Sequence, residues 1–295
     1  MKKEYVKKQH YIPQFVLRTF VNSSKGIPFV NIKKQPLELM YSKPINLMQE
    51  RDFYEIKNIY GEYVSRNLIE EIHSYIESDI SIDYQKFIDL TLKEDFEDKF
   101  SELVGTEDWA KIEASLLLYL IQTLIRGRGI KNITYTNSEL PKRYQDIIYL
   151  LMTTSKSITA KFAMEMFIGE ELEGILHFIK DDTYNEAFPI LAEHILNKYQ
   201  IRVCVVEGNK SFFLSDNPVI VQKFEEEDYI LPFSPKVCLI LKEMKIEKNI
   251  IKIDKNIFKL DDDSVDRINK HSIQNTDRQL IVSKQSDLKF IEKYV

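Results

Sequence analysis

The chain has 295 residues, of which 44% are apolar and 29% charged, and its formal net charge is −5 at pH 7. These values are typical of a globular protein and exclude a disordered chain. The acidic balance disfavours a protein that coats nucleic acid indiscriminately, because that affinity comes from an excess of Lys and Arg. Without a run of roughly 18 apolar residues or an apolar segment after the basic start, we expect a cytoplasmic protein with no membrane partner.

This length allows one large domain or two small ones, and we expect a single intertwined domain over residues 1–295. Cys204 and Cys238 both lie in apolar, strand-like runs. They are expected to be small buried side chains in a reducing compartment rather than a disulfide or metal framework.

Helical periodicity dominates residues 1–199. A short helix is predicted over 13–20, with Pro13 in its first turn. A small hairpin follows, with strands over 28–33 and 37–41. From 63 to 103, apolar residues recur at steps of three and four, which predicts a helical hairpin.

An apolar central helix is predicted over residues 109–125. Asp108 is its expected N-cap, and Gly127 and Gly129 are expected to end it. Three more helices are predicted at 144–152, 159–167 and 185–198.

At residue 200 the apolar period changes to two. Segments 201–207 and 211–221 flank Gly208-Asn209 and are predicted to form a hairpin. Further strands are expected at 229–232, 237–242, 250–254 and 279–282, with a helix over 262–275. The predicted fold class is α+β: a mainly helical part (1–199) packed on a C-terminal antiparallel sheet (200–295).

The segment His10-Tyr11-Ile12-Pro13-Gln14-Phe15 contains the first candidate catalytic residues. His10 and Gln14 can point toward one spot at the helix start, and His is the side chain that exchanges a proton near neutral pH. The alternative is that His10 caps the helix or fixes the N-terminal arm through a backbone hydrogen bond.

Ser215-Asp216-Asn217-Pro218 interrupts an apolar strand and must form a bulge or turn there, because proline cannot donate to a sheet ladder. Asp216 and Asn217 are candidate catalytic residues, and Ser215 is a candidate binding residue. Asp216 could orient His10, bind a ribose hydroxyl or hold a metal, and a divalent metal is the one cofactor expected here. Alternatively it shapes the strand exit as an Asx-turn.

Gln122 and Arg126 are long polar side chains one turn apart on the apolar central helix. A buried guanidinium needs an anion, so Arg126 is a candidate phosphate ligand unless it reaches water at the helix end. Two clusters are candidates for a local basic groove. One is Arg126 with Arg128 and Lys131 at the end of the central helix, and the other is Lys2, Lys3, Lys7 and Lys8 beside His10. The alternative is solvated charge.

Other binding candidates are Ser234, before Pro235, and a group of polar residues on or after the last helix. Ser234 suits local hydroxyl-to-backbone bonding at least as well as ligand binding. The group suits either capping or recognition of a nucleotide edge. Its members are Asn269, Gln274, Asn275 and Arg278.

The opening motif and several later segments resemble a bacterial family catalogued as domain of unknown function 4238. The later segments are Asp52-Phe53-Tyr54, Gln122 to Arg126, Phe213 to Pro218, Pro232 to Pro235, Asn269 and Asn275 to Ser283. The resemblance covers nearly the whole chain. It implies a bacterial intracellular protein, with relatives in phage-defence or mobile-element settings, and no established chemistry.

The chain lacks a phosphate-binding Gly-rich loop, a nucleophile elbow and a zinc-protease helix. We expect a defence or toxin-type enzyme that cleaves nucleic acid, RNA above DNA, by acid/base chemistry. His10 would move the proton and Arg126 would neutralise phosphate. The alternatives are a non-catalytic anti-phage sensor that binds a protein partner and a nucleotide-binding transferase. Oligomeric state is left open.

Overall fold

A computed structural model describes residues 5–21, 24–136, 139–181, 187–224, 227–244, 246–247, 250–251 and 257–295. Long helices combined with several antiparallel sheets confirm the α+β class. Lys2, Lys3, the start of the helix predicted from 185 and most of the strand predicted at 250–254 lie outside these ranges.

A five-stranded sheet forms the centre of the molecule, with strand order β14-β7-β11-β10-β9. All neighbours are antiparallel except β14, which pairs with β7 in parallel. The strands are β7 (Tyr199–Val206), β9 (Ile220–Phe224), β10 (Glu227–Pro232), β11 (Val237–Glu243) and β14 (Phe258–Leu260). A small ribbon of β12 (Ile246–Glu247) and β13 (Ile250–Ile251) follows β11.

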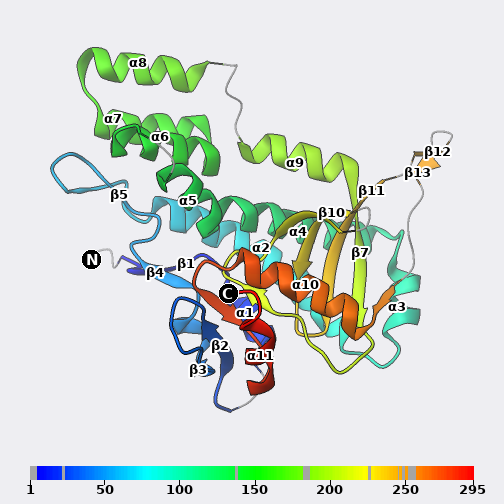
Figure 1. Cartoon of the computed structure of the whole chain (residues 1–295). Coiled ribbons are helices and arrows are strands. Elements are labelled where there is room, and N and C mark those ends of the chain that lie inside the picture. The colour runs from blue at the N-terminus through cyan, green and yellow to red at the C-terminus, as the bar shows by residue number, and fades with distance from the viewer. Residues whose placement is uncertain are drawn as a thin grey trace.

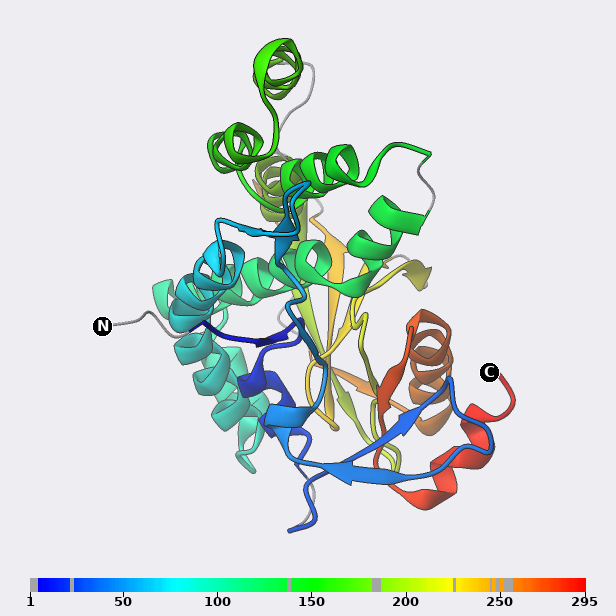
Figure 2. The same ribbon diagram turned by 90° about the vertical axis from the view of Figure 1, so that its left-hand side faces the viewer.

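Alternate residues of each strand point to opposite faces of this sheet. On both faces these residues are buried against other elements. Val203 and Leu239 belong to the main core, whereas Cys204 and Cys238 pack toward α10 (Asp262–Asn275). The two buried cysteines are opposite each other on β7 and β11. Figure 2 shows the sheet between α10 and the helices of the N-terminal half.

The N-terminal half supplies the long helices of the main core. They are α2 (Leu68–Thr91), α3 (Phe96–Leu103) and α4 (Glu107–Arg126), and α2 packs along α4. The N-cap of α4 is Thr106, whose side chain accepts from the Trp109 amide at 3.2 Å, so the prediction of Asp108 is wrong. Gly127 follows the last residue of α4 as predicted, but Gly129 lies inside α5 and does not end a helix.

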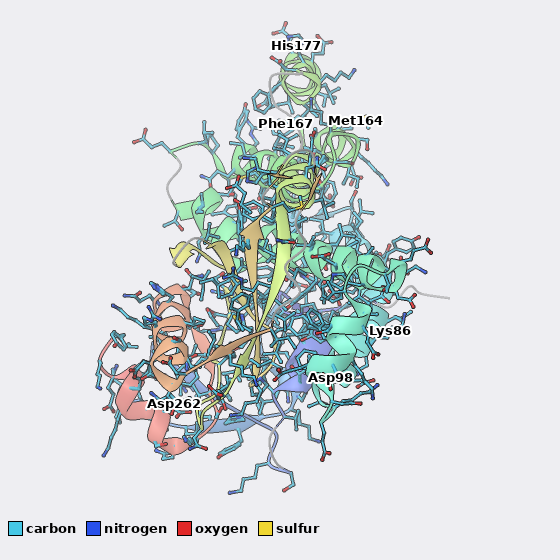
Figure 3. The ribbon with its side chains drawn as sticks, turned by 90° about the vertical axis from the view of Figure 1, so that its right-hand side faces the viewer. Lys86, Asp98, Met164, Phe167, His177 and Asp262 are labelled. Carbon is cyan, nitrogen blue, oxygen red and sulfur yellow. The ribbon has the colours of Figure 1, made fainter. Side chains whose placement is uncertain are left out.

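The remaining helices stack on one end of the core (Figure 1). They are α5 (Arg128–Thr136), α6 (Lys142–Thr153), α7 (Lys156–Met166), α8 (Gly169–Lys180) and α9 (Ala187–Lys198). Met164, Phe167 and His177 mark this end in Figure 3, whereas Asp262, at the start of α10, lies at the other. Helix α8 was not predicted from the sequence.

A four-stranded sheet of order β3-β2-β15-β8 joins the two ends of the chain. Its outer strands come from the N-terminal hairpin, as predicted, and from the segment before Asp216. The strands are β2 (Ile27–Asn31), β3 (Met40–Ser42), β8 (Leu214–Ser215) and β15 (Gln279–Ile281). The remaining short elements of the two ends are α1 (Gln14–Thr19), η1 (Pro44–Asn46), η2 (Gln285–Asp287) and α11 (Leu288–Ile291). Two further ribbons are β1 (Lys8–His10) with β4 (Gln49–Arg51), and β5 (Ile56–Lys57) with β6 (Tyr63–Val64), which contacts α7.

The hairpin predicted around Gly208-Asn209 is wrong. β7 pairs with β11 and β14, whereas residues 211–221 divide into β8 and β9, which belong to different sheets. The chain crosses between the sheets at Asp216-Asn217-Pro218, where proline has no amide hydrogen for a ladder. The polar segment therefore marks a sheet switch rather than a bulge within one strand.

Among the described helices, none is both long and apolar enough to cross a membrane.

Candidate functional site

The opening motif begins in the ribbon of β1 and β4. Lys8 is opposite Arg51 and His10 is opposite Gln49. Residues that are opposite each other, or two apart, share one face of such a ribbon. His10 therefore lies on the same face as Lys8, Gln49 and Arg51.

That face opens into a cleft with a volume of about 530 Å³, which we call the basic cleft. Its lining carries four cationic side chains, four amides and one carboxylate: Lys7, Lys8, Arg51, Arg278, Asn31, Asn46, Gln49, Gln279 and Glu50. Glu50 is already ion-paired with Arg128, and Arg51 lies 3.6 Å from Asp52. The cleft is thus rich in hydrogen-bond donors and carries net positive charge.

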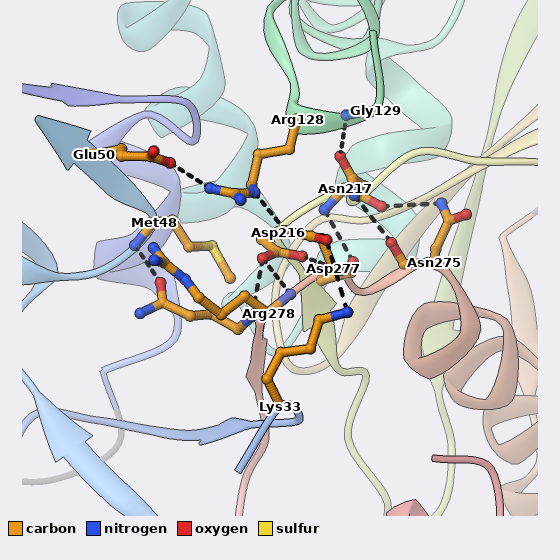
Figure 4. A network of polar contacts seen from close by, with 12 residues as sticks. Lys33, Met48, Glu50, Arg128, Gly129, Asp216, Asn217, Asn275, Asp277 and Arg278 are labelled. Carbon is orange, nitrogen blue, oxygen red and sulfur yellow. Dashed lines mark hydrogen bonds and ion pairs between the residues drawn. The ribbon is translucent and has the colours of Figure 1, made fainter. Parts of the chain in front are cut away.

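Asp216 holds one wall of the basic cleft in place. Its carboxylate is fully buried and accepts three consecutive backbone N–H groups, from Asp277 at 2.8 Å and from Arg278 and Gln279 at 2.9 Å. Burial raises the pKa of Asp216, and the three hydrogen bonds oppose that rise. The loop that presents Arg278 and Gln279 to the cleft is therefore shaped by this one side chain (Figure 4).

Asn217 connects the same loop to the helical half. Its Oδ1 accepts from the Gly129 amide at 2.7 Å, and its Nδ2 donates to the Asn275 carbonyl at 3.1 Å. Asn275 in turn donates to the carbonyls of Asn217 at 3.0 Å and Val219 at 2.9 Å.

Arg128 forms the centre of the polar network in Figure 4. Its Nε donates to Asp277 at 2.7 Å, its Nη1 pairs with Glu50, and its guanidinium lies 5.6 Å from the ring centre of Tyr11. Burial, with the nearby charge of Asp216, raises the pKa of Tyr11 to about 12. Three segments far apart in sequence therefore meet here: the opening motif, the start of α5 and the loop before β15.

Arg126 lies in the protein interior with 1% of its surface exposed. It donates to Glu77, to the Tyr54 hydroxyl at 3.1 Å and to the His10 carbonyl. Its guanidinium is thus occupied by protein acceptors, and Arg126 does not line the basic cleft. It fixes the backbone of β1 from the protein side.

Two further titratable groups surround Arg126. Burial raises the pKa of Glu70 to about 7, and burial also lowers the pKa of His73 well below its usual range. Gln122 donates to the His73 carbonyl at 3.3 Å, and its Nε2 lies 3.4 Å from the His73 ring. Gln122, like Arg126, is thus placed in the interior of the protein.

The His10 ring faces the backbone of Pro44 and Ile45. Burial lowers the pKa of His10, hydrogen bonding with that backbone opposes the effect, and the Arg126 charge adds to it. The imidazole is therefore neutral at pH 7, with Nε2 buried and lacking a hydrogen-bond partner within the described chain. No contact joins His10 to the carboxylate of Asp216 in the part of the chain that the structure describes. Gln14 is half-buried at the start of α1.

The other predicted binding residues bond to nearby backbone. Ser215 accepts from the Asn217 amide at 2.9 Å, and Ser234 accepts from the amides of Lys236 and Val237. Asn269 links α10 to the Phe213 amide at 2.8 Å. Of the predicted binding residues, only Arg278 lines the basic cleft.

Sequence reasoning missed most of the cleft lining. Gln49, Arg51 and Gln279 lie in short strands, and no periodic pattern distinguishes them. The signal that was present is the basic leader, since Lys7 and Lys8 do line the cleft. Across the described ranges, no group of three or more His, Cys, Asp or Glu is placed to hold a metal ion.

Residues 8–287 match the family described as "protein of unknown function (DUF4238)". The chain belongs to this family. Searches of curated proteins and of solved structures found no match. The matched region includes both the β1–β4 ribbon and the Asp216 loop. The family description assigns no chemistry to either of them.

Proposed function

We propose that this DUF4238 protein binds the sugar-phosphate backbone of a nucleic acid in the basic cleft, with single-stranded RNA as the favoured target. The observation that carries the proposal is the lining itself: four cations and four amides with one carboxylate, Glu50, that is already paired with Arg128. Phosphate oxygens accept hydrogen bonds from both kinds of group. A local basic cleft on an acidic protein favours a specific site over general coating of nucleic acid.

Arg278 is the central residue of this proposal. Asp216 and its three amide bonds set the backbone of Arg278, and the Arg278 Nε is buried without a hydrogen-bond partner among the described residues. A planar guanidinium held by its backbone is well suited to bind phosphate through two hydrogen bonds.

The test is binding of labelled single-stranded RNA and DNA, measured by fluorescence anisotropy over a range of salt concentrations. Neutralising about four phosphates gives a slope of log K against log salt near −3 for a single strand. The double variant Lys8→Met, Arg278→Met should reduce that slope by about 1.4. Lys86→Met, a surface lysine of α2 that does not line the cleft, is the matched control. An unchanged slope in the double variant would remove the proposal.

A second function, RNA phosphodiester cleavage, rests on His10. His10 is on the same face of the β1–β4 ribbon as Lys8 and Gln49, which line the cleft, but it does not itself line the cleft. Burial keeps its imidazole unprotonated at pH 7, as a general base requires. In this proposal His10 takes the proton of an RNA 2′-hydroxyl, which DNA lacks. The 2′-oxygen then bonds to the adjacent phosphorus to give a 2′,3′-cyclic phosphate, the P–O5′ bond breaks, and the 5′-oxygen leaves with a proton from water. Substrate binding must open access to the buried Nε2. The cationic side chains of the cleft neutralise charge that develops on the phosphate.

Cleavage is tested with RNA and the matching DNA, each with Mg²⁺ and with a chelator. We expect His10→Asn to bind RNA as tightly as the wild type but to cleave it about 100-fold more slowly or worse. Equal cleavage by His10→Asn, or equal cleavage of DNA, would exclude this role for His10. Growth arrest on expression, abolished by the same substitution, is the cellular readout for a defence or toxin role.

A further inference from the structure

A second cavity lies beside the basic cleft and shares Glu50 with it. It lies between the segment after β4, which supplies Phe53 and Tyr54, and helices α5 and α6, which supply Lys131, Tyr135 and Tyr149. We call it the aromatic cavity. Its volume is about 380 Å³, within the range of roughly 300–1,000 Å³ typical of small-molecule sites.

Aromatic rings line the aromatic cavity from two sides. Tyr135 and Tyr149 form one pair, with ring centres 5.7 Å apart, and Phe53 and Tyr54 form another at 4.9 Å. Such surfaces favour a ligand with a flat, apolar ring.

Tyr149 also offers an unused polar group. Its side chain is 1% exposed, and its hydroxyl has no hydrogen-bond partner among the described residues. A buried tyrosine hydroxyl normally has a partner, because leaving it unpaired is costly. A ligand with a hydrogen-bond acceptor would supply that partner.

Lys131 supplies a positive charge that no side chain neutralises directly among the described residues, although the carboxylates of Glu50 and Asp146 are near enough to raise its pKa. Its Nζ donates to the Phe53 carbonyl and lies 4.1 Å from the Phe53 ring centre, and no ion pair is found for it within the described residues. The other cations of the cavity are paired: Arg128 with Glu50 and Asp277, and Lys142 with Asp146. Burial lowers the pKa of Lys131 to about 8, a change that a bound anion would reverse.

From these features we propose that the aromatic cavity binds a nucleoside monophosphate. The base lies against the ring of Tyr135, which is only half-buried, and Lys131 binds the phosphate. The buried Tyr149 hydroxyl donates to the nucleoside once binding opens access to it. This site goes beyond the proposed function, which concerns the basic cleft alone. Substitutions in the cleft should therefore weaken RNA binding without affecting nucleotide binding, and substitutions in the cavity should do the reverse.

Binding is measured calorimetrically with the four ribonucleoside monophosphates, and then with adenosine and with inorganic phosphate alone. At least one nucleotide should bind with a Kd below about 1 mM, and more tightly than either fragment. Lys131→Met should weaken that nucleotide about tenfold or more but leave adenosine unchanged. Tyr149→Phe should weaken nucleotide and adenosine alike, by roughly fivefold.

Tyr144→Phe and Lys86→Met are the controls, since neither residue lines the cavity. The Lys8→Met, Arg278→Met variant of the basic cleft should bind the nucleotide as the wild type does. A readout that needs no variant is acylation of Lys131 by an amine-reactive reagent, mapped by mass spectrometry, which the bound nucleotide should suppress. The proposal is overturned if none of the four nucleotides binds, if phosphate alone binds equally well, or if nucleotide leaves Lys131 acylation unchanged.

Discussion

Removing the carboxylate of Asp216 should destabilise the protein through three backbone amides rather than through any lost catalytic contact. In the wild type, one oxygen accepts from Arg278 and Gln279 and the other accepts from Asp277, all at 2.8–2.9 Å. Asp216 is fully buried, so water cannot easily replace it. Each buried N–H left without an acceptor costs about 1–3 kcal/mol, so Asp216→Ala should lower the free energy of unfolding by about 5 kcal/mol.

Asp216→Asn should cost less, because the amide oxygen can keep the two bonds to Arg278 and Gln279. The new NH₂ group then faces the Asp277 N–H, and one bond is lost. Asparagine also avoids the desolvation of a buried charge that raises the pKa of Asp216. We expect a loss of about 2 kcal/mol for this variant.

The assay is equilibrium unfolding in urea at pH 7, with Asp277→Asn as the matched control. Asp277 is more exposed, and its carboxylate binds Arg128 and lies 3.9 Å from Lys33, so its replacement should cost about 1 kcal/mol or less. The reasoning is refuted if Asp216→Ala unfolds within about 1 kcal/mol of the wild type, or if Asp277→Asn is the more damaging change.

Three further stability predictions concern the helices that support the site. The pKa of Glu70 is raised to about 7, so the folded protein loses stability as pH rises from 4.5 through 7 and this buried carboxyl ionises. In urea unfolding, the free energy of unfolding of Glu70→Gln should therefore rise by about 2 kcal/mol relative to that of the wild type between pH 5 and pH 8. His73 has a lowered pKa, so the stability it gives above pH 6.5 is lost as pH falls. The melting temperature of His73→Asn should therefore fall less than that of the wild type between pH 7 and pH 5, and an equal fall would contradict this. Thr106→Ala should cost about 1 kcal/mol by chemical denaturation while Thr106→Ser costs little, because only the hydroxyl caps the Trp109 amide.

The elements that the sequence predicted best are those whose determinants are local. Helix α10 has the predicted bounds, because its apolar positions recur at helical spacing and the Asp261 side chain caps it by accepting from Ser264 at 2.8 Å. The N-terminal hairpin of β2 and β3 was also predicted. Pairing between distant strands was not, because β8 and β15 are two and three residues long and carry no periodicity of their own.

The buried polar residues illustrate a second limit. Arg126 was expected to need an anion, and it has one, but Glu77 lies 49 positions earlier on another helix. Gln9, one residue before the opening motif, is fully buried and connects the Tyr54 amide to Glu55. A sequence shows that a polar residue interrupts an apolar pattern, but it does not show which distant backbone group will meet it.

Most residues that carry the family resemblance do not line the basic cleft, and Asp216 shows how such a residue can still shape it. A carboxylate that accepts three amide hydrogens, as Asp216 does, has few lone pairs left for a metal or a hydroxyl. In the proposed binding site, Asp216 would act on a ligand through Arg278 and Gln279, whose backbone it fixes beside the cleft. Arg126 similarly fixes the backbone of His10, because its guanidinium donates to the His10 carbonyl from the protein interior. If the cleft is the functional surface, conservative changes at Asp216 should alter ligand affinity in proportion to their effect on this loop, whereas changes at Arg278 should alter affinity without a matching loss of stability.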